Sequence, residues 1–232
     1  MSKGIGEYLN SSNYFLLSTY AISTSILYQW GYWGRFDVNV LQFMSLSEIL
    51  RSAAYPFVGS LLAFGAGILV SGLGSKAKPA GGGADSKIGK FLRSNHEPLT
   101  GLFVIVAMVL FVFCGEYRWV ASGSVLTIVA MSWAAKLDVL DGVFPDPKLR
   151  QVLLLFAVST PILSFSVGAT NAERILGGNS YKQVTIGKSG LTYKYLGHAG
   201  EYAFLMSMDN KEIYMEHTSQ LDVLVLRRVF ER

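Results

Sequence analysis

The sequence is poor in the residues that most often build metal and redox sites. It contains one cysteine, Cys114, and three histidines among 232 residues. A single cysteine excludes a disulfide framework within one chain and a metal site made of several thiolates. The histidines, His96, His198 and His217, are not spaced as H-x-x-x-H, the pattern of a metal site on a helix. We therefore predict no metal site and no cofactor.

Charged residues are also few, at 16% against about 25% in soluble domains. The longest apolar runs contain no Asp, Glu, Lys, Arg or His in their central turns, where ion-coupled transporters need such groups. The sequence lacks a G-x-S-x-G motif, and the glycines at 81–83 lack the Gly-Lys-Ser/Thr of a phosphate loop. The sequence therefore indicates a non-enzymatic protein, with no catalytic residue and no small-molecule substrate inferred.

What the chain does contain is long apolar segments that approach or exceed the length needed to cross a hydrocarbon core of about 30 Å. The clearest is Gln151 to Leu176. Its first 22 residues are uncharged, and a helix of that length reaches about 33 Å. The segment from Trp119 to Ala135 is less hydrophobic because it contains several Ser and Thr residues. We predict a membrane helical bundle of five spans, or four if that segment does not cross. The five segments are Asn13–Gly34, Ser45–Ser71, Pro98–Gly115, Trp119–Ala135 and Gln151–Leu176.

Three local patterns refine these helices. Ser45-Leu-Ser-Glu48 has the spacing of a capping box, which predicts a helix start. Pro161 lies inside the last helix, where proline kinks or interrupts the hydrogen-bond ladder. Small residues also recur at every fourth position, which leaves one side of a helix open to close packing. We interpret Pro161 and these small residues as packing features, with a hinge in the last helix as the alternative. The small residues are Gly59, Ala63, Gly67 and Ser71 in the second predicted helix, and Ser164, Gly168 and Ala172 in the last.

From Gly177 onward the sequence changes from helical to strand-like. Five segments rich in Val, Ile, Tyr and Thr alternate with turn sequences such as Gly187-Lys-Ser-Gly190. We predict a C-terminal all-β module of about five strands, a meander or a small barrel of SH3-like size. The predicted domains are residues 1–176 and 177–232. The predicted strands are 181–186, 191–196, 201–208, 212–217 and 222–229.

The net charge of +4 is unevenly distributed. The segment from Glu173 onward holds 8 Lys and Arg against 7 Asp and Glu, which gives no basic stripe for nucleic acid. The segment from Lys76 to Arg93 holds five Lys and Arg against one acid, Asp85. Short basic loops of membrane proteins stay on the cytoplasmic side. This pattern predicts a multi-pass integral protein with a cytoplasmic N-terminus.

Two stretches carry a resemblance. The run from Tyr28 to Leu41, YQWGYWGRFDVNVL, and the run from Tyr195 to Phe204, YLGHAGEYAF, resemble small polytopic proteins of the bacterial inner membrane. Some proteins of that design serve as immunity partners of toxins or as components of phage defence. The resemblance implies an inner-membrane protein that contacts the lipid bilayer and acts by recognising a protein partner. A homo-oligomeric channel, or a membrane sensor gated through the last helix and the β module, is the alternative.

Overall fold

The computed structural model describes residues 11–52, 94–134, 147–186, 191–220 and 224–230. The chain divides into two compact units, one made of Met1–Ala53 with Ser164–Arg232 and the other of Ala54–Leu163. This division by contacts falls within the last long helix, two residues after Pro161. The domain boundary proposed at Leu176 and Gly177 stays a prediction.

The first unit contains α1 (Ser11–Trp33) and the C-terminal part of α6 (Pro147–Leu176). The two helices approach each other closely at a pair of glycines. A Cβ atom on Gly168 would overlap the carbonyl oxygen of Tyr28 and lie 3.0 Å from the amide nitrogen of Tyr32. A Cβ on Gly31 would overlap the carbonyl oxygen of Phe165. Only glycine fits at these two positions, because backbone atoms occupy the space that a side chain needs.

After α1 the chain forms two short 3-10 helices, η2 (Gly34–Phe36) and η3 (Val40–Gln42), and then enters a helical segment at 46–52. The capping box predicted for this helix is present. The Ser45 backbone N–H donates to the Glu48 carboxylate at 2.8 Å, and the Glu48 N–H donates to the Ser45 hydroxyl at 3.4 Å. The helix start is thus fixed by the sequence itself.

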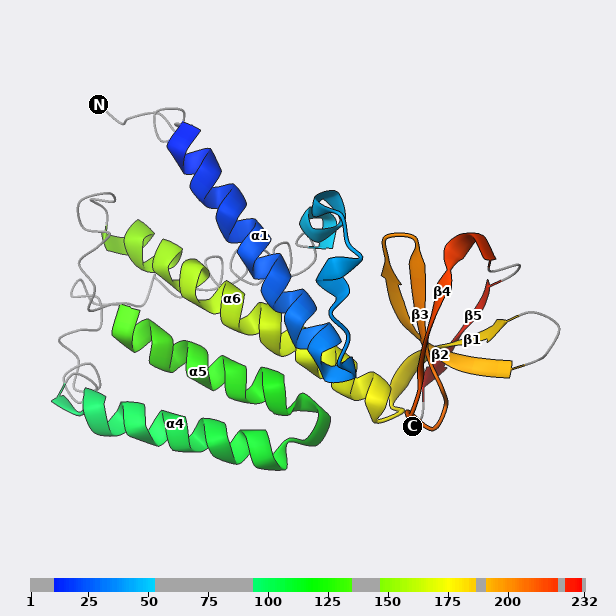
Figure 1. The fold of residues 1–232 in the computed structure, drawn as a ribbon. Helices are drawn as coiled ribbons and strands as arrows, with labels where there is room; N and C mark the ends of the chain where they lie inside the picture. Colours follow the sequence, from blue (N-terminus) through cyan, green and yellow to red (C-terminus); the bar gives the residue numbers. More distant parts are fainter. Residues whose placement is uncertain (1–10, 53–93, 135–146, 187–190, 221–223, 231–232) are drawn as a thin grey trace, which may run out of the picture. The chain divides into compact units, whose positions relative to one another are not determined.

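The C-terminal segment folds into a five-stranded antiparallel sheet with the strand order β4-β3-β2-β1-β5 (Figure 1). The first four strands pair in chain order, as in a meander. The last strand instead returns across the sheet to pair with β1, with Val184 opposite Leu226. The short helix η7 (Thr218–Gln220) precedes it. The strands are β1 (Ser180–Ile186), β2 (Leu191–Ala199), β3 (Tyr202–Met206), β4 (Ile213–His217) and β5 (Leu224–Phe230).

One core joins the helix ends of this unit to its sheet. Trp33 is 4% exposed, and its ring lies 5.0 Å from that of Phe204 on β3, centroid to centroid. Ala172 of α6 is fully buried in the same cluster. Burying a large apolar side chain contributes about 1.5–3 kcal/mol, so a small sheet gains much of its stability from such contacts. The cluster consists of Trp33, Phe36, Val40, Ala172, Leu196, Ala199, Phe204 and Met206.

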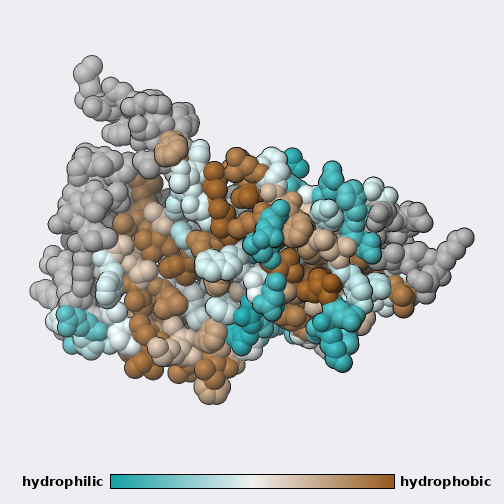
Figure 2. Space-filling view, in the orientation of Figure 1, coloured by the Kyte–Doolittle hydropathy of each residue, from teal (hydrophilic) through white to brown (hydrophobic). Residues whose placement is uncertain are grey.

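In the second unit, α4 (His96–Phe113) and α5 (Arg118–Ala134) form a helical hairpin through η5 (Gly115–Tyr117). The Phe111 and Trp119 rings pack edge to face at 4.9 Å, and the Arg118 guanidinium lies 5.4 Å from the Phe111 ring. Figure 2 shows apolar surface over this region. The exposed apolar side chains of α4 include Leu102, Ile105, Met108, Val109, Val112 and Phe113.

The prediction of five membrane-spanning helices, with four as the alternative, is wrong. Within the described ranges, one helix, Leu153–Leu176, is long and apolar enough to cross a membrane, judged by length and composition alone. The helix α5 has 17 residues, a length of about 26 Å against a core of about 30 Å. The apolar part of α4, Glu97–Phe113, is likewise too short. The helix α1 is long enough at 23 residues, but its serines and threonines lower its hydropathy.

The remaining proposed span, 45–71, lies mostly outside the described residues. The location that depended on several spans, a multi-pass protein of the inner membrane with a cytoplasmic N-terminus, is therefore corrected as well. The error arose because two uncharged runs near the lower length limit, and one longer run of low hydropathy, were counted as spans.

Candidate functional site

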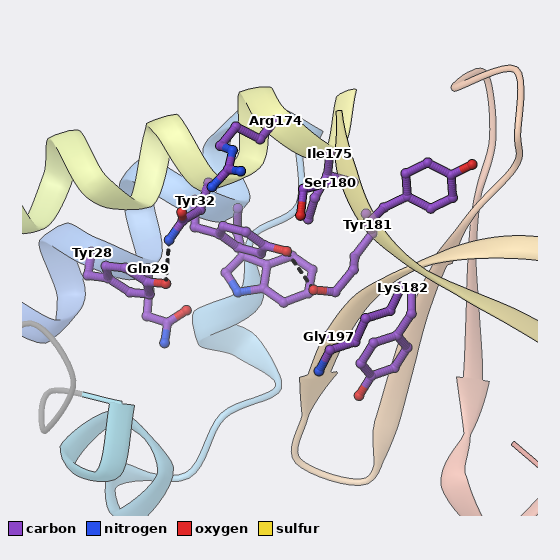
Figure 3. A pocket seen from close by; sticks show the side chains of 13 residues that line it. Tyr28, Gln29, Tyr32, Arg174, Ile175, Ser180, Tyr181, Lys182 and Gly197 are labelled. Atoms are coloured by element: carbon purple, nitrogen blue, oxygen red, sulfur yellow. Dashed lines mark hydrogen bonds between the residues drawn. The ribbon is translucent and has the colours of Figure 1, made fainter. Parts of the chain in front are cut away.

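A cavity of about 490 Å³ lies in the first unit, where the ends of α1 and α6 meet strands β1 and β2 (Figure 3). Its volume falls within the range of small-ligand sites, about 300–1,000 Å³. The lining residues are Tyr28, Gln29, Tyr32 and Trp33 from α1, Asn171, Arg174 and Ile175 from α6, Ser180, Tyr181 and Lys182 from β1, and Tyr195, Leu196 and Gly197 from β2. We call this cavity the tyrosine pocket.

Helical spacing explains how each helix contributes one side of the pocket. Tyr28 and Tyr32 are four residues apart on α1, and their rings lie parallel at 6.5 Å between centroids. Asn171, Arg174 and Ile175 are separated by three and four residues on α6, so they share one face.

Where the sheet lines the tyrosine pocket, a β-bulge in β2 shapes the pocket wall. The register of β2 against β3 shifts between Tyr195 and Gly197, and Gly197 has φ of +156°. A Cβ on Gly197 would lie 3.2 Å from the Trp33 ring. Glycine at this position lets the strand approach the end of α1 closely, which is a common use of glycine in bulged strands.

Two hydrogen bonds join residues that line the pocket (Figure 3). The Tyr32 hydroxyl donates to the Leu196 carbonyl at 2.6 Å and so connects α1 to β2. The Asn171 amide donates to the Tyr28 hydroxyl at 3.5 Å and connects α6 to α1. Burial raises the pKa of Tyr32 far above its usual value, and burial also raises the pKa of Tyr195. Both phenols therefore stay neutral at physiological pH.

Two charged side chains, Arg174 of α6 and Lys182 of β1, are among the described residues that line the pocket. No Asp or Glu is among those described lining residues. The neighbouring carboxylate of Glu173 forms an ion pair with Arg35. The described lining residues also include no His or Cys, so they offer no imidazole base and no thiolate nucleophile.

A second constellation lies at the far end of β4. The His217 Nε2 atom is 2.8 Å from the Glu201 carboxylate, and its Nδ1 atom is 2.7 Å from the Ser219 hydroxyl. These are the residue types of a serine–histidine–acid triad. However, the Ser219 backbone N–H also contacts His217 Nδ1 at 3.3 Å, and the Glu201 side chain is 79% exposed. None of the three lines the tyrosine pocket, and we interpret the group as a link between β4 and the β2–β3 turn.

A search of the described ranges finds no group of three or more His, Cys, Asp or Glu residues that could hold a metal ion. Cys114 is a free thiol at the end of α4.

The residues predicted from the sequence to be packing features lie partly outside and partly inside the described residues. Gly59, Ala63, Gly67 and Ser71 lie outside the described residues. Pro161 is inside α6, whereas Ser164, Gly168 and Ala172 are buried along that helix. Gly168 is at the closest approach of α6 to α1. Pro161, Ser164, Gly168 and Ala172 do not line the tyrosine pocket, but Gly168 sets the spacing of the helices whose ends form it. A hinge at Pro161 stays a prediction.

The tyrosine pocket was missed in the sequence because its residues come from four separate segments. One signal was present, because Tyr28, Tyr32 and Trp33 belong to the aromatic-rich run from Tyr28 to Leu41 that carries the resemblance. Comparison with family models, characterised proteins and solved structures gives no significant match. The geometry of the pocket is therefore the basis for a functional proposal.

Proposed function

We propose that this protein acts by recognising a protein partner and carries out no chemistry of its own. The observation that supports the proposal is the tyrosine pocket, which combines aromatic and cationic side chains and has no His, Cys, Asp or Glu among its described lining residues. We call the surrounding structure, the C-terminal ends of α1 and α6 with the five-stranded sheet, the binding head. The resemblance stated above suggests a partner of the toxin-immunity or phage-defence kind.

The side chains of the pocket are those that most often dominate the energy of protein interfaces. Tyrosine, tryptophan and arginine are enriched at interface hot spots because they offer a large contact area together with a polar group. Tyrosine also loses little conformational entropy on binding. Here Tyr32 and Trp33 are already held by the core and by the hydrogen bond to Leu196, so little ordering is needed when a partner binds.

A sensor gated through α6 is the second candidate, and one observation favours it. The helix that contains the candidate span also provides Asn171, Arg174 and Ile175 to the pocket. Its end is bonded to the sheet, because the Asn210 amide donates to the Leu176 carbonyl at 3.0 Å and the Lys194 ammonium to the Ile175 carbonyl at 3.4 Å. A ligand in the pocket would therefore contact α6 and the sheet together.

The protein encoded beside this chain is the first partner to test, by co-expression, co-purification and titration. Tyr195→Ala should weaken the complex at least tenfold, since it removes an aromatic wall of the pocket. Tyr214→Ala is the matched control, because Tyr214 is an exposed tyrosine of β4 outside the pocket. Equal binding of the partner by the two variants would show that the pocket is not the recognition surface.

A further inference from the structure

We propose that Gln29 binds the main chain of an extended segment of the partner, through the N–H and the C=O of a single residue. This inference rests on the proposed function, because it names the group of the partner that the binding head recognises. The contact is neutral and does not depend on the charged side chains of the tyrosine pocket. Gln29 thereby sets the position of the partner's chain in the pocket.

The side chain of Gln29 is buried but has no hydrogen-bond partner in the described part of the chain. The residue is 6% exposed and lines the tyrosine pocket from α1. Figure 3 shows hydrogen bonds at the hydroxyls of its neighbours Tyr28 and Tyr32 but none at Gln29. An amide withdrawn from water without a partner costs free energy, and a ligand that supplies the missing bonds recovers it. The position of Gln29 therefore indicates a contact that forms on binding.

Gln29 also lines a second cavity, of about 530 Å³, in the same unit of the chain. The two cavities are neighbours, because Gln29 and Trp33 line both of them. The other described residues that line the second cavity lie between Ile26 and Leu41, at the end of α1 and in the segment that follows it. A group bonded to Gln29 therefore has space toward each cavity. This arrangement favours a chain that continues past Gln29 over a small ligand that ends there.

The hydrogen-bonding groups of an amide side chain match those of an extended main chain. The Gln29 amide offers a carbonyl acceptor beside an NH₂ donor. A residue in an extended chain presents its own N–H and C=O on the same side, as in the hydrogen-bonded pairs of an antiparallel sheet. Gln29 can thus accept from the N–H and donate to the C=O of one residue. A carboxylate ligand would use the donor alone and leave the Gln29 carbonyl without a bond.

The first test is Gln29→Met, which keeps an unbranched apolar side chain of similar length and removes both hydrogen-bonding groups. Because the free protein loses no hydrogen bond, its melting temperature should stay the same or rise. Its affinity for the partner, the protein encoded beside this chain, should fall about tenfold. Gln42→Met is the control and should keep full affinity, since Gln42 is an exposed glutamine of η3 that lines neither cavity. A lower melting temperature for Gln29→Met would assign the amide a structural bond and overturn the inference.

The second test uses two small probes on the purified full chain. They are N-acetyl-phenylalanine N-methylamide and its depsipeptide analogue, in which an ester oxygen replaces the N–H of the phenylalanine. Both are neutral and carry the same ring, which the aromatic walls of the pocket can contact. In NMR titrations the amide should bind the unchanged protein about tenfold more tightly than the ester, and Gln29→Met should bind the two equally. Equal binding of both probes by the unchanged protein, or binding of neither, overturns the inference.

The two tests together separate this inference from the function on which it rests. If Tyr195→Ala loses the partner but Gln29→Met does not, the inference is wrong and the proposed function stands. If Gln29→Met loses the partner while the unchanged protein does not distinguish the probes, Gln29 contacts a side chain of the partner and the main-chain contact is refuted. If both variants keep the partner and only Gln29→Met loses the preference for the amide, the pocket binds a free peptide. Recognition of the partner by the pocket is then refuted.

Discussion

The carboxylate of Glu48 accepts a hydrogen bond of 2.9 Å from the backbone N–H of Gly200, a residue 152 positions further along the chain. Glu48 is the last residue of the capping box that starts the helical segment at 46–52, and Gly200 is in the β2–β3 turn with φ of +57°. A carboxylate that fixes a helix start thus also fixes a turn of the sheet. A Cβ on Gly200 would overlap the carbonyl oxygen of Phe43, so the turn packs closely against the same segment.

This relationship predicts a loss of stability in acid. Hydrogen bonds from the backbone N–H and then the hydroxyl of Ser45, with a further one from Gly200, lower the pKa of Glu48 below its ordinary value of 4.5. A lowered pKa in the folded state means that the contribution is complete above pH 4.5 and is lost as the pH falls through the folded pKa. The melting temperature should therefore fall below that pH.

The matched variant is Glu48→Gln, which keeps the geometry of a capping box but cannot titrate. Thermal melts between pH 3 and pH 7 should show a smaller acid loss for this variant than for the unchanged protein. All other carboxylates are common to both proteins, so the difference isolates Glu48. Identical pH profiles would show that the ionisation of Glu48 does not contribute to the loss of stability in acid.

The close approach of α1 and α6 predicts a strong effect at Gly168. Gly168→Ala should lower the free energy of unfolding by about 1–3 kcal/mol, the usual cost of overpacking, because the new methyl group meets the Tyr28 carbonyl. Gly101→Ala in α4 is the control, because a Cβ there has no neighbour within 4 Å. That control should be neutral or stabilise by about 0.5–1 kcal/mol. Denaturant titration measures the free energy of unfolding of the two variants. Equal stabilities would contradict the close packing of α1 against α6 at Gly168.

The bond from Tyr32 to Leu196 predicts a difference between two tyrosines of the same pocket. Tyr32→Phe should cost about 1–3 kcal/mol of unfolding free energy, because the buried Leu196 carbonyl loses its donor. Tyr28→Phe should cost less, since the Asn171 amide contacts the Tyr28 hydroxyl at 3.5 Å. Thermal unfolding of the two variants measures this difference. A larger loss of stability for Tyr28→Phe than for Tyr32→Phe would contradict the prediction.

Local features of the fold could be read from the sequence, and features that depend on distant residues could not. The capping box at Ser45 and Glu48 needs four neighbouring residues, so its spacing alone was sufficient. Strands from Ser180 onward follow from β-branched and aromatic residues between turn sequences. The return of β5 to pair with β1 does not, because register between strands far apart in sequence depends on the whole core.

The predicted membrane spans and the tyrosine pocket show the same limit of prediction from local sequence. Apolar content in α4 and α5 predicted membrane crossing, but a hairpin of about 17-residue helices falls short of the required length. The tyrosine pocket needs Tyr32, Lys182 and Tyr195 together, and no periodicity relates these positions. Its aromatic residues on α1 are close together in the sequence, whereas the proximity of Arg174 on α6 and Lys182 on β1 to them depends on the fold.

The joint between α6 and the sheet is short, and its backbone N–H groups are hydrogen-bonded to the end of α6. The Gly177, Gly178 and Asn179 N–H groups donate to the carbonyls of Glu173, Ile175 and Arg174 at 2.8, 3.1 and 3.0 Å, and Gly178 has φ of +78°. These bonds satisfy the last carbonyls of the helix, as glycine-rich helix ends commonly do. The strand β1 begins directly afterwards, at Ser180.

The final prediction concerns this joint. A flexible Gly/Ser insert of about ten residues after Gly178 should leave α6 and the sheet folded, because exposed joints tolerate insertion. It should nevertheless weaken binding of the partner protein, since the side chains of α6 and β1 that line the pocket would no longer be held at a fixed distance from each other. The same insert at Ser189, in the turn sequence between β1 and β2, is the control and should leave this affinity unchanged. If both insertion variants bind the partner as the unchanged protein does, the contacts of the core alone hold the two walls of the pocket together. The covalent joint would then have no role in recognition, and gating of the sheet through α6 would be excluded with it.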